Sequence, residues 1–304
     1  MAVKTVQAVI NGVTTTLTYN STSKKYEATI TAPATSSYNN NDGHYFPVTI
    51  KATDEAGNVT TKNDTDATLG SSLQLRVKEK TAPAITITYP TASALIINNK
   101  PAIRWKVTDN DSGVNPDTIG ITIDSGSKVT GSAITKTAIT GGYDCTYTPT
   151  TALADGSHTI KIDAADNDGN AATQKSVTFK IDTVPPTLSV TAPVNGLITN
   201  KAACTVTGTT NDITSSPVTV TVKLNSGSAE AVTVGADGSF SKALTPVSGG
   251  NTITVVATDS AGKSTTVTRT VTLDTVAPTI KAVTLTPNPV DAGKTYVISV
   301  EVTD

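Results

Sequence analysis

Hydrophobic and polar residues alternate with a period of two along most of the chain. The alternation is plain in ITVVATD (253–259) and in YVISVEVTD (296–304). A period of two places the apolar side chains on one face of a β-strand, and β-branched residues suit such a strand. Gly, Asn, Asp and Pro interrupt the pattern where turns are expected. The pattern therefore predicts an all-β chain of short strands.

Three linker segments divide the chain into repeats. Each contains a proline followed by a short alternating stretch, and the equivalent residues are Pro83, Pro186 and Pro278. These prolines lie 103 and 92 residues apart. Proline blocks ladder hydrogen bonds and stiffens a junction. The spacing predicts domains of about 100 residues, which is the size of a small two-sheet sandwich.

A strand followed by a glycine turn occurs once in each repeat. The three copies are VTIKATDEAGN (48–58), IKIDAADNDGN (160–170) and ITVVATDSAGK (253–263). Val48, Ile50 and Ala52 alternate on the first strand, and the other two strands have the same apolar alternation. We expect these residues to face a core, and we expect positive φ at the turn glycines.

The linkers DTVPPT (182–187) and DTVAPT (274–279), together with the turn ATDEAGN (52–58), resemble those of bacterial immunoglobulin-like (Big-type) domains. Such domains occur in surface proteins and in phage virion proteins. The resemblance covers nearly the whole chain and implies tandem immunoglobulin-like β-sandwiches. It implies little about function, because these domains serve as spacers, adhesins and assembly modules.

The three repeats also share a hairpin, which contains Gly12, Gly126 or Gly227. They differ in the strands that precede this hairpin. In the second and third repeats, two expected strands precede the hairpin and end 26 residues after the linker proline. The first repeat lacks them. The segment after Pro278 supplies them in 26 residues and adds nothing more. We therefore expect an incomplete N-terminal domain and an orphan C-terminal strand pair.

The expected domains follow from these boundaries. Residues 1–80 form an immunoglobulin-like domain without its first two strands, A and B; residues 81–182 and 183–275 form complete domains; and residues 276–304 form donor strands A and B.

Strand complementation between copies is the function that this division predicts. Tyr296, Ile298, Val300 and Val302 alternate on the last strand, and the offset from the linker proline matches them to core positions of the second repeat. We expect this face to fill the first domain of the next copy, against Val48, Ile50 and Ala52. Repetition of that contact would build a head-to-tail filament.

Two alternatives stay open. The C-terminal strands could anchor in another virion or surface protein, or the chain could be an adhesin or decoration module that binds a cell-surface glycan or protein. We expect an extracellular filament or a virion component, such as a phage tail appendage. No signal peptide is recognisable in the first residues, so a virion protein released by lysis and a surface fibre exported by another route both fit.

Composition limits the remaining function classes. A formal net charge of -2 argues against nucleic acid as a partner, and no apolar run is long enough to span a membrane. Two cysteines cannot form a disulfide framework. With two histidines and no HExxH, GxSxG or Walker motif, the sequence predicts a non-enzymatic protein.

The sequence DND is the one candidate for metal binding. It occurs twice, beside glycine, and offers Asp109, Asp111, Asp166 and Asp168. Alternating carboxylates near a glycine can surround Ca²⁺. The same residues also favour ordinary turns. We expect no other cofactor.

Overall fold

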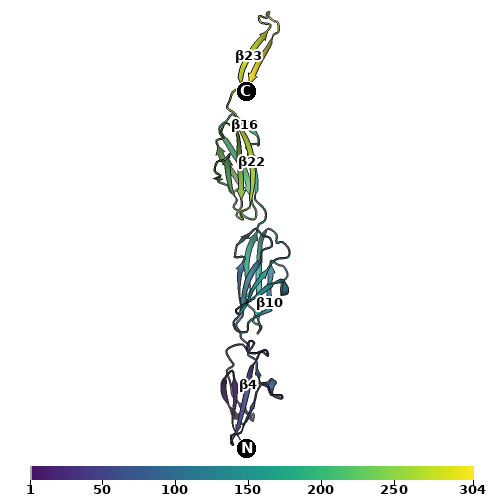
Figure 1. The fold of residues 1–304 in the computed structure, drawn as a ribbon, viewed down its shortest axis with the longest axis vertical. Coiled ribbons are helices and arrows are strands. Elements are labelled where there is room, and N and C mark those ends of the chain that lie inside the picture. Colours follow the sequence, from purple (N-terminus) through teal and green to yellow (C-terminus); the bar gives the residue numbers. More distant parts are fainter. Residues whose placement is uncertain (1) are drawn as a thin grey trace. The chain divides into compact units, whose positions relative to one another are not determined.

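The structure is a computed structural model, and it describes residues 2–304. The regular elements of these residues are β-strands and two short 3-10 helices, with no α-helix. The chain divides into two compact units, one ending at Ile181 and the other spanning Asp182–Asp304, and each is described by itself (Figure 1).

A single six-stranded sheet makes up the first part of the first unit. Its order is β3-β2-β1-β4-β5, with β6 paired to β4. The elements are β1 (Val3–Ile10), β2 (Val13–Asn20), β3 (Lys25–Glu27), β4 (Phe46–Asp54), β5 (Val59–Lys62), the 3-10 helix η1 (Gly70–Leu73) and β6 (Gln74–Leu75). Asn11 and Gly12 both have positive φ in the β1–β2 turn, as a type I′ hairpin requires.

The second part of the first unit is a two-sheet sandwich. One sheet has the order β10-β13-β14-β8 and the other β11-β12-β9-β7. The elements are β7 (Ala84–Tyr89), β8 (Leu95–Ile96), β9 (Ile103–Thr108), β10 (Val114–Ile123), η2 (Gly131–Ala133), β11 (Thr135–Ile139), β12 (Gly142–Tyr147), β13 (Gly156–Asp166) and β14 (Lys175–Ile181). The sheets enclose one apolar core around Trp105 and Phe179.

The second unit holds another two-sheet sandwich and a separate hairpin. The sandwich sheets have the orders β15-β17-β20 and β16-β22-β21-β18-β19. The elements are β15 (Thr187–Ala192), β16 (Leu197–Thr199), β17 (Cys204–Asn211), β18 (Thr219–Leu224), β19 (Glu230–Val232), β20 (Ser239–Leu244), β21 (Gly249–Thr258) and β22 (Ser264–Leu273). Within residues 2–304, β23 (Thr279–Thr286) and β24 (Val297–Thr303) pair only with each other.

The expected fold class, tandem immunoglobulin-like sandwiches, is confirmed. The expected backbone of the three glycine turns is also found, since Gly57, Gly169 and Gly262 have φ of 88°, 93° and 84°. Both sandwiches place the strand before this turn in their core, next to the strand after it.

The two sandwich cores fill one equivalent position in different ways. Trp105 on β9 lies 22 residues after Pro83, and it faces Cys145 on β12. Gly208 on β17 lies 22 residues after Pro186, and it faces Phe240 on β20. A Cβ atom on Gly208 would lie 2.5 Å from the Phe240 ring. A large and a small residue thus exchange strands while the core stays filled.

A second pair of equivalent positions makes a charged contact in the second domain and a neutral one in the third. His158 Nδ1 lies 2.8 Å from Asp124 Oδ2, and His158 Nε2 lies 2.7 Å from the Ala154 carbonyl oxygen. In the next sandwich, Asn225 Nδ2 donates to Asn251 Oδ1 at 3.0 Å. Burial disfavours the imidazolium, but the hydrogen bonds to Ala154 and Asp124 outweigh it and raise the pKa of His158.

This contact predicts a pH dependence that the neutral pair lacks. Because the pKa of His158 is higher in the folded chain than in the unfolded chain, where it is about 6.5, protonation of His158 stabilises the fold. This stabilisation is complete at pH values below the unfolded pKa and is lost as pH rises through the folded pKa. The melting temperature of this domain, measured by the fluorescence of Trp105, should therefore fall as pH rises from about 6.5 through the raised pKa of His158. The double variant Asp124→Asn/His158→Asn should lose that slope, and an unchanged slope would contradict the assignment.

Candidate functional site

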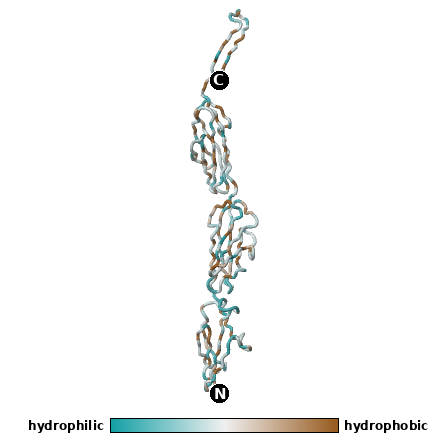
Figure 2. Tube along the Cα trace, in the orientation of Figure 1, coloured by the Kyte–Doolittle hydropathy of each residue, from teal (hydrophilic) through white to brown (hydrophobic). Residues whose placement is uncertain are grey.

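One face of the β23–β24 hairpin is apolar. The register pairs Ile280 with Val302, Val283 with Val300 and Leu285 with Ile298, so the six side chains share a face. We call this the donor face: Ile280, Val283, Leu285, Ile298, Val300 and Val302. All six are exposed, by 42% to 65%. Hydrophobic and hydrophilic residues alternate along the two arms of this hairpin (Figure 2). The opposite face carries mainly polar residues, such as Thr284, Ser299 and Glu301.

Three residues of the donor face occupy positions that belong to the core in the second domain. Ile298, Val300 and Val302 have the same offsets from the linker proline as Ile103, Trp105 and Val107. The last three are 0% exposed in their sandwich, whereas their counterparts on the hairpin are 50% to 56% exposed. The hairpin therefore has the pattern of a sandwich strand pair without the sheet that covers it. Tyr296 precedes the face at the same parity and is 50% exposed.

The first sheet has an uncovered face of the same kind. The pairing of β1 with β4 places Val6 beside Ala52, Ala8 beside Ile50 and Ile10 beside Val48. We call these six residues the acceptor face. Five of these residues are only half-buried, and Ala8 alone among the six is buried, at 4% exposed. The counterparts of Val48, Ile50 and Ala52 in the two sandwiches, Ile160, Ile162 and Ala164, and Ile253, Val255 and Ala257, are at most 5% exposed. Within residues 2–80, no second sheet covers the acceptor face.

A free strand edge lies in the same sheet as the acceptor face, with β2 between them. β3 ends its sheet in the order β3-β2-β1-β4-β5. In the second domain, the β11–β12 pair corresponds to β2–β3, and β12 continues to β9 and β7. An edge strand offers unpaired N–H and C=O groups to a further strand. The first domain can therefore take up a strand pair equivalent to β7 and β9.

Each face also contains three residues that were not predicted from the sequence. Ile280, Val283 and Leu285 on the donor face were not expected, because the register shifts between Ile280 and Ala282 and breaks the simple alternation. Val6, Ala8 and Ile10 on the acceptor face do alternate in the sequence, so that signal was present.

Two of the four candidate metal ligands come together. Asp109 and Asp166 form a cluster with Glu79, in which one oxygen of each lies within 4.8 Å of the others. Asp111 Oδ1 instead accepts from the Ser36 N–H, and Asp168 Oδ2 accepts from the Glu79 N–H, both at 2.9 Å. Burial raises the pKa of Glu79, which the sequence did not single out.

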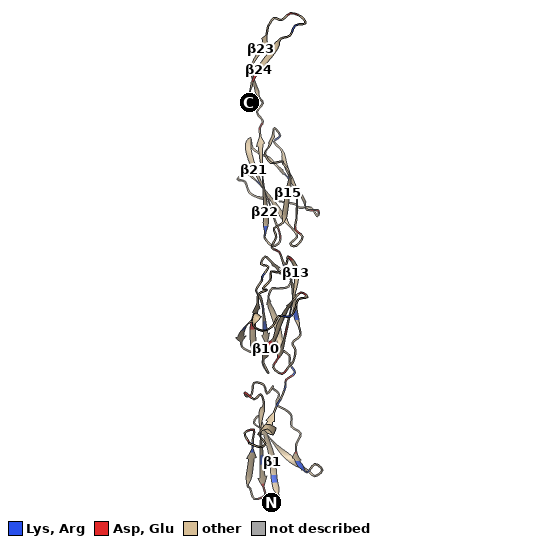
Figure 3. Cartoon of the chain, turned by 90° about the vertical axis from the view of Figure 1, so that its right-hand side faces the viewer, with Lys and Arg blue, Asp and Glu red and all other residues tan. Residues whose placement is uncertain are grey.

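The second unit contains an equivalent acidic cluster. It consists of Asp182, Asp212 and Asp259, whose ligand oxygens also lie within 4.8 Å of one another. Asp212 lies 26 residues after Pro186, just as Asp109 lies 26 residues after Pro83. Elsewhere the charged residues are scattered along the strands and loops (Figure 3).

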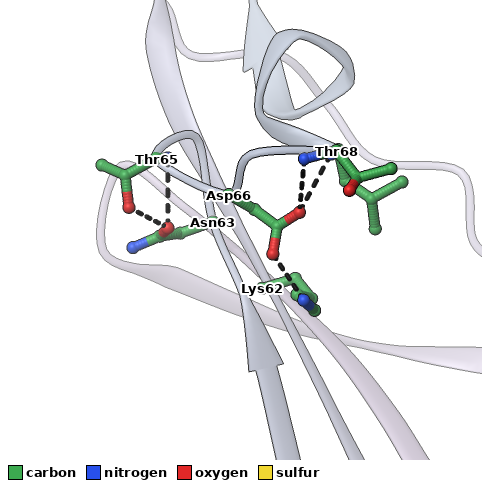
Figure 4. Close-up of polar contacts among 6 residues, drawn as sticks. Lys62, Asn63, Thr65, Asp66 and Thr68 are labelled. Atoms are coloured by element: carbon green, nitrogen blue, oxygen red, sulfur yellow. Dashed lines mark hydrogen bonds and ion pairs between the residues drawn. The ribbon is translucent and has the colours of Figure 1, made fainter.

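A polar turn between β5 and η1 has a structural role. Asp66 accepts hydrogen bonds from Lys62 Nζ at 2.5 Å and from the backbone of Thr68 and Leu69, both at 3.0 Å (Figure 4). The Lys62 contact and these backbone donors lower the pKa of Asp66 to about 2. The carboxylate is thus fully engaged in closing the turn.

Two family profiles match parts of the chain. The family described as "Bacterial Ig-like domain" matches residues 91–183, and "Glucodextranase, domain B" matches residues 186–275. Each match falls on one of the two-sheet sandwiches. The matches support repeats of the bacterial immunoglobulin-like type. The search of the curated proteins found no match.

Several solved structures are similar to the chain. The fibronectin(III)-like modules of Clostridium thermocellum CbhA are 19% identical, with a TM-score of 0.33 over 63% of this chain and 94% of that one. An I-band fragment of titin is 13% identical, with a TM-score of 0.43 over 90% and 88%. Sidekick-1 immunoglobulin domains are 11% identical, with a TM-score of 0.37 over 90% and 68%.

The two-sheet sandwiches and the family profiles that match them define tandem immunoglobulin-like domains. This class is compatible with a structural or adhesive role, and its domains are typically non-catalytic and often extracellular. Among the described residues, no helix has the length and apolar character needed to cross a membrane.

Proposed function

We propose that the chain is a structural, non-enzymatic fibre subunit that polymerises head to tail by donor-strand complementation. Residues 276–304 of one copy complete the domain of residues 1–80 in the next copy. The product is an extracellular filament or a phage tail or virion appendage. The observation that carries the proposal is a pair of apolar faces with core-type residues that are exposed or half-buried: Ile298, Val300 and Val302 on the donor face, and Val48, Ile50 and Ala52 on the acceptor face. Their counterparts in the two complete sandwiches are buried.

The donor face would supply what the acceptor face lacks. In the second domain, the side chains of β9 pack against those of β10 and β13 in one core. β24 corresponds to β9, and β1 and β4 correspond to β10 and β13. Covering the donor face would bury six apolar side chains, each contributing about 1.5–3 kcal/mol as an upper limit.

The backbone supports the same arrangement. β24 would pair with the free edge of β3, as β9 pairs with β12, and β23 would extend the new sheet. Donor and acceptor are different surfaces, so the contact is heterologous, and an open assembly of any length keeps one unfilled donor at one end and one unfilled acceptor at the other. Such a contact propagates into an open fibre unless the copies close into a ring.

The test compares the full chain with a variant that lacks residues 279–304. We expect the full chain to form filaments whose length rises with concentration, seen by sedimentation velocity and negative-stain electron microscopy. The truncated variant should stay soluble and monomeric, because it keeps the acceptor face but has no donor. A full chain that stays monomeric at all concentrations, as an adhesin with uncovered ends would, contradicts the proposal. Long filaments from the truncated chain contradict it equally.

A further inference from the structure

Three carboxylates of the second unit converge from separate parts of one domain. Asp182 precedes β15, Asp212 follows β17 and Asp259 follows β21. One oxygen of each lies within 4.8 Å of the others. The chain thus brings three like charges to one end of the sandwich.

Local hydrogen bonds hold two of these carboxylates in place. Asp212 Oδ1 accepts from the N–H groups of Thr214 and Ser215, at 2.8 and 2.7 Å. Asp182 Oδ1 accepts from the Val184 N–H at 3.2 Å, and Asp182 Oδ2 accepts from the Ser215 hydroxyl. The arrangement is therefore fixed before any ligand arrives.

No protein cation balances these charges. Asp182 is 0% exposed and Asp259 is 6% exposed. Within residues 2–304, the ion pairs involve other groups, and none joins a Lys or Arg to this cluster. Burying like charges without a counterion is costly. The geometry therefore needs a positive charge that the domain itself does not supply.

One oxygen of Asp259 has no hydrogen-bond partner among the described residues. Asp259 Oδ1 accepts from the Lys263 N–H at 2.9 Å, but Oδ2 is buried without a hydrogen bond. In the equivalent turns, the second oxygen is satisfied by an asparagine side chain: Asn58 donates to Asp54 at 2.9 Å and Asn170 to Asp166 at 2.6 Å. Lys263 replaces that asparagine in the third turn, so the oxygen is left free.

We propose that Asp182, Asp212 and Asp259 bind a calcium-type divalent cation, with the free Asp259 Oδ2 as one ligand. Carboxylate oxygens are the ligands that Ca²⁺ prefers, and Ca²⁺ accepts irregular geometry more readily than Mg²⁺. The cluster of Glu79, Asp109 and Asp166 differs, because Asn170 already fills the corresponding oxygens of Asp166. The bound ion would tie Asp182, at the entry to the domain, to the two loops that follow β17 and β21.

The first measurement is a calcium titration of the full chain from which EDTA has removed bound metal. Calorimetry gives the number of calcium ions bound per chain. Asp259→Asn should bind one equivalent fewer than the natural chain. The matched control Glu230→Gln removes an exposed carboxylate of β19 in the same domain and should leave the calcium stoichiometry unchanged. Equal stoichiometry in the natural chain and Asp259→Asn, or no binding up to millimolar Ca²⁺, would overturn the proposal, as would an equally strong response to Mg²⁺.

The second measurement separates ion binding from a general effect on folding. At a calcium concentration of 100 times Kd, the melting temperature of this domain should rise by about 10 °C. Without calcium, Asp259→Asn should melt higher than the natural chain, because one like charge is gone, and calcium should no longer raise it. Hydrogen exchange in peptides of β17 and β21 localises the change. A calcium response retained in this variant's β17 and β21 would refute the site.

Discussion

Val300→Asp is expected to abolish self-association of the full chain, whereas Val297→Asp leaves it intact. Both residues lie on β24 and are exposed in the single copy, by 50% and 63%. They differ only in the face they occupy, since Val300 belongs to the donor face and Val297 to the opposite one. In the proposed assembly, Asp at position 300 would be buried at the position of Trp105 without a partner.

The expected loss follows from the cost of that buried charge. An unpaired carboxylate in an apolar core costs several kcal/mol, so the dissociation constant should rise by about 100-fold or more. Sedimentation velocity over a range of concentrations would measure it. Since neither side chain is buried in the single copy, circular dichroism of both variants should match the natural chain. Equal loss of association in the two variants would show that the donor face is not the contact.

The sequence was sufficient for the fold because the repeats encode the strands directly. Alternation on β13 and β21, the glycine turns after them and the linker prolines all predicted the sandwiches that form. The same offsets placed Ile298, Val300 and Val302 on one face of the last strand, and the structure has them there.

The candidate sites were less predictable because they depend on contacts between distant segments. Glu79 and Asp182 lie in linkers, and nothing local distinguishes them from ordinary solvated acids. Only the sandwich brings each of them to the turns at the ends of two strands. The bulge in β23 is equally hidden, since the register of a strand is set by its partner.

Trp105→Ala is expected to destabilise the second domain by about 3–5 kcal/mol, the usual cost of removing a large buried aromatic side chain. Trp105 is 0% exposed and lies between Ile87 on β7 and Cys145 on β12. Its small neighbour Cys145 cannot fill the space that is left. The melting temperature of this domain should fall by more than about 10 °C, measured by calorimetry.

The control is Trp105→Phe, which keeps most of the ring volume. Trp105 Nε1 is buried without a hydrogen bond, so its removal forfeits no partner and the cost should stay near 1–2 kcal/mol. Burial raises the pKa of the Cys145 thiol to about 11. A cavity beside this thiol should speed its labelling in Trp105→Ala, with buried Cys204 as the internal reference. Unchanged melting and labelling would contradict the packing assigned to Trp105.

The third domain suggests a rescue that tests the same packing from the other side. There, Gly208 and Phe240 occupy the positions of Trp105 and Cys145. The double variant Trp105→Gly/Cys145→Phe transfers that pair to the second domain and restores a large residue opposite a small one. It should melt higher than Trp105→Gly alone, because the added ring occupies the cavity. A double variant no more stable than the single one would show that the two sandwiches do not share this packing rule.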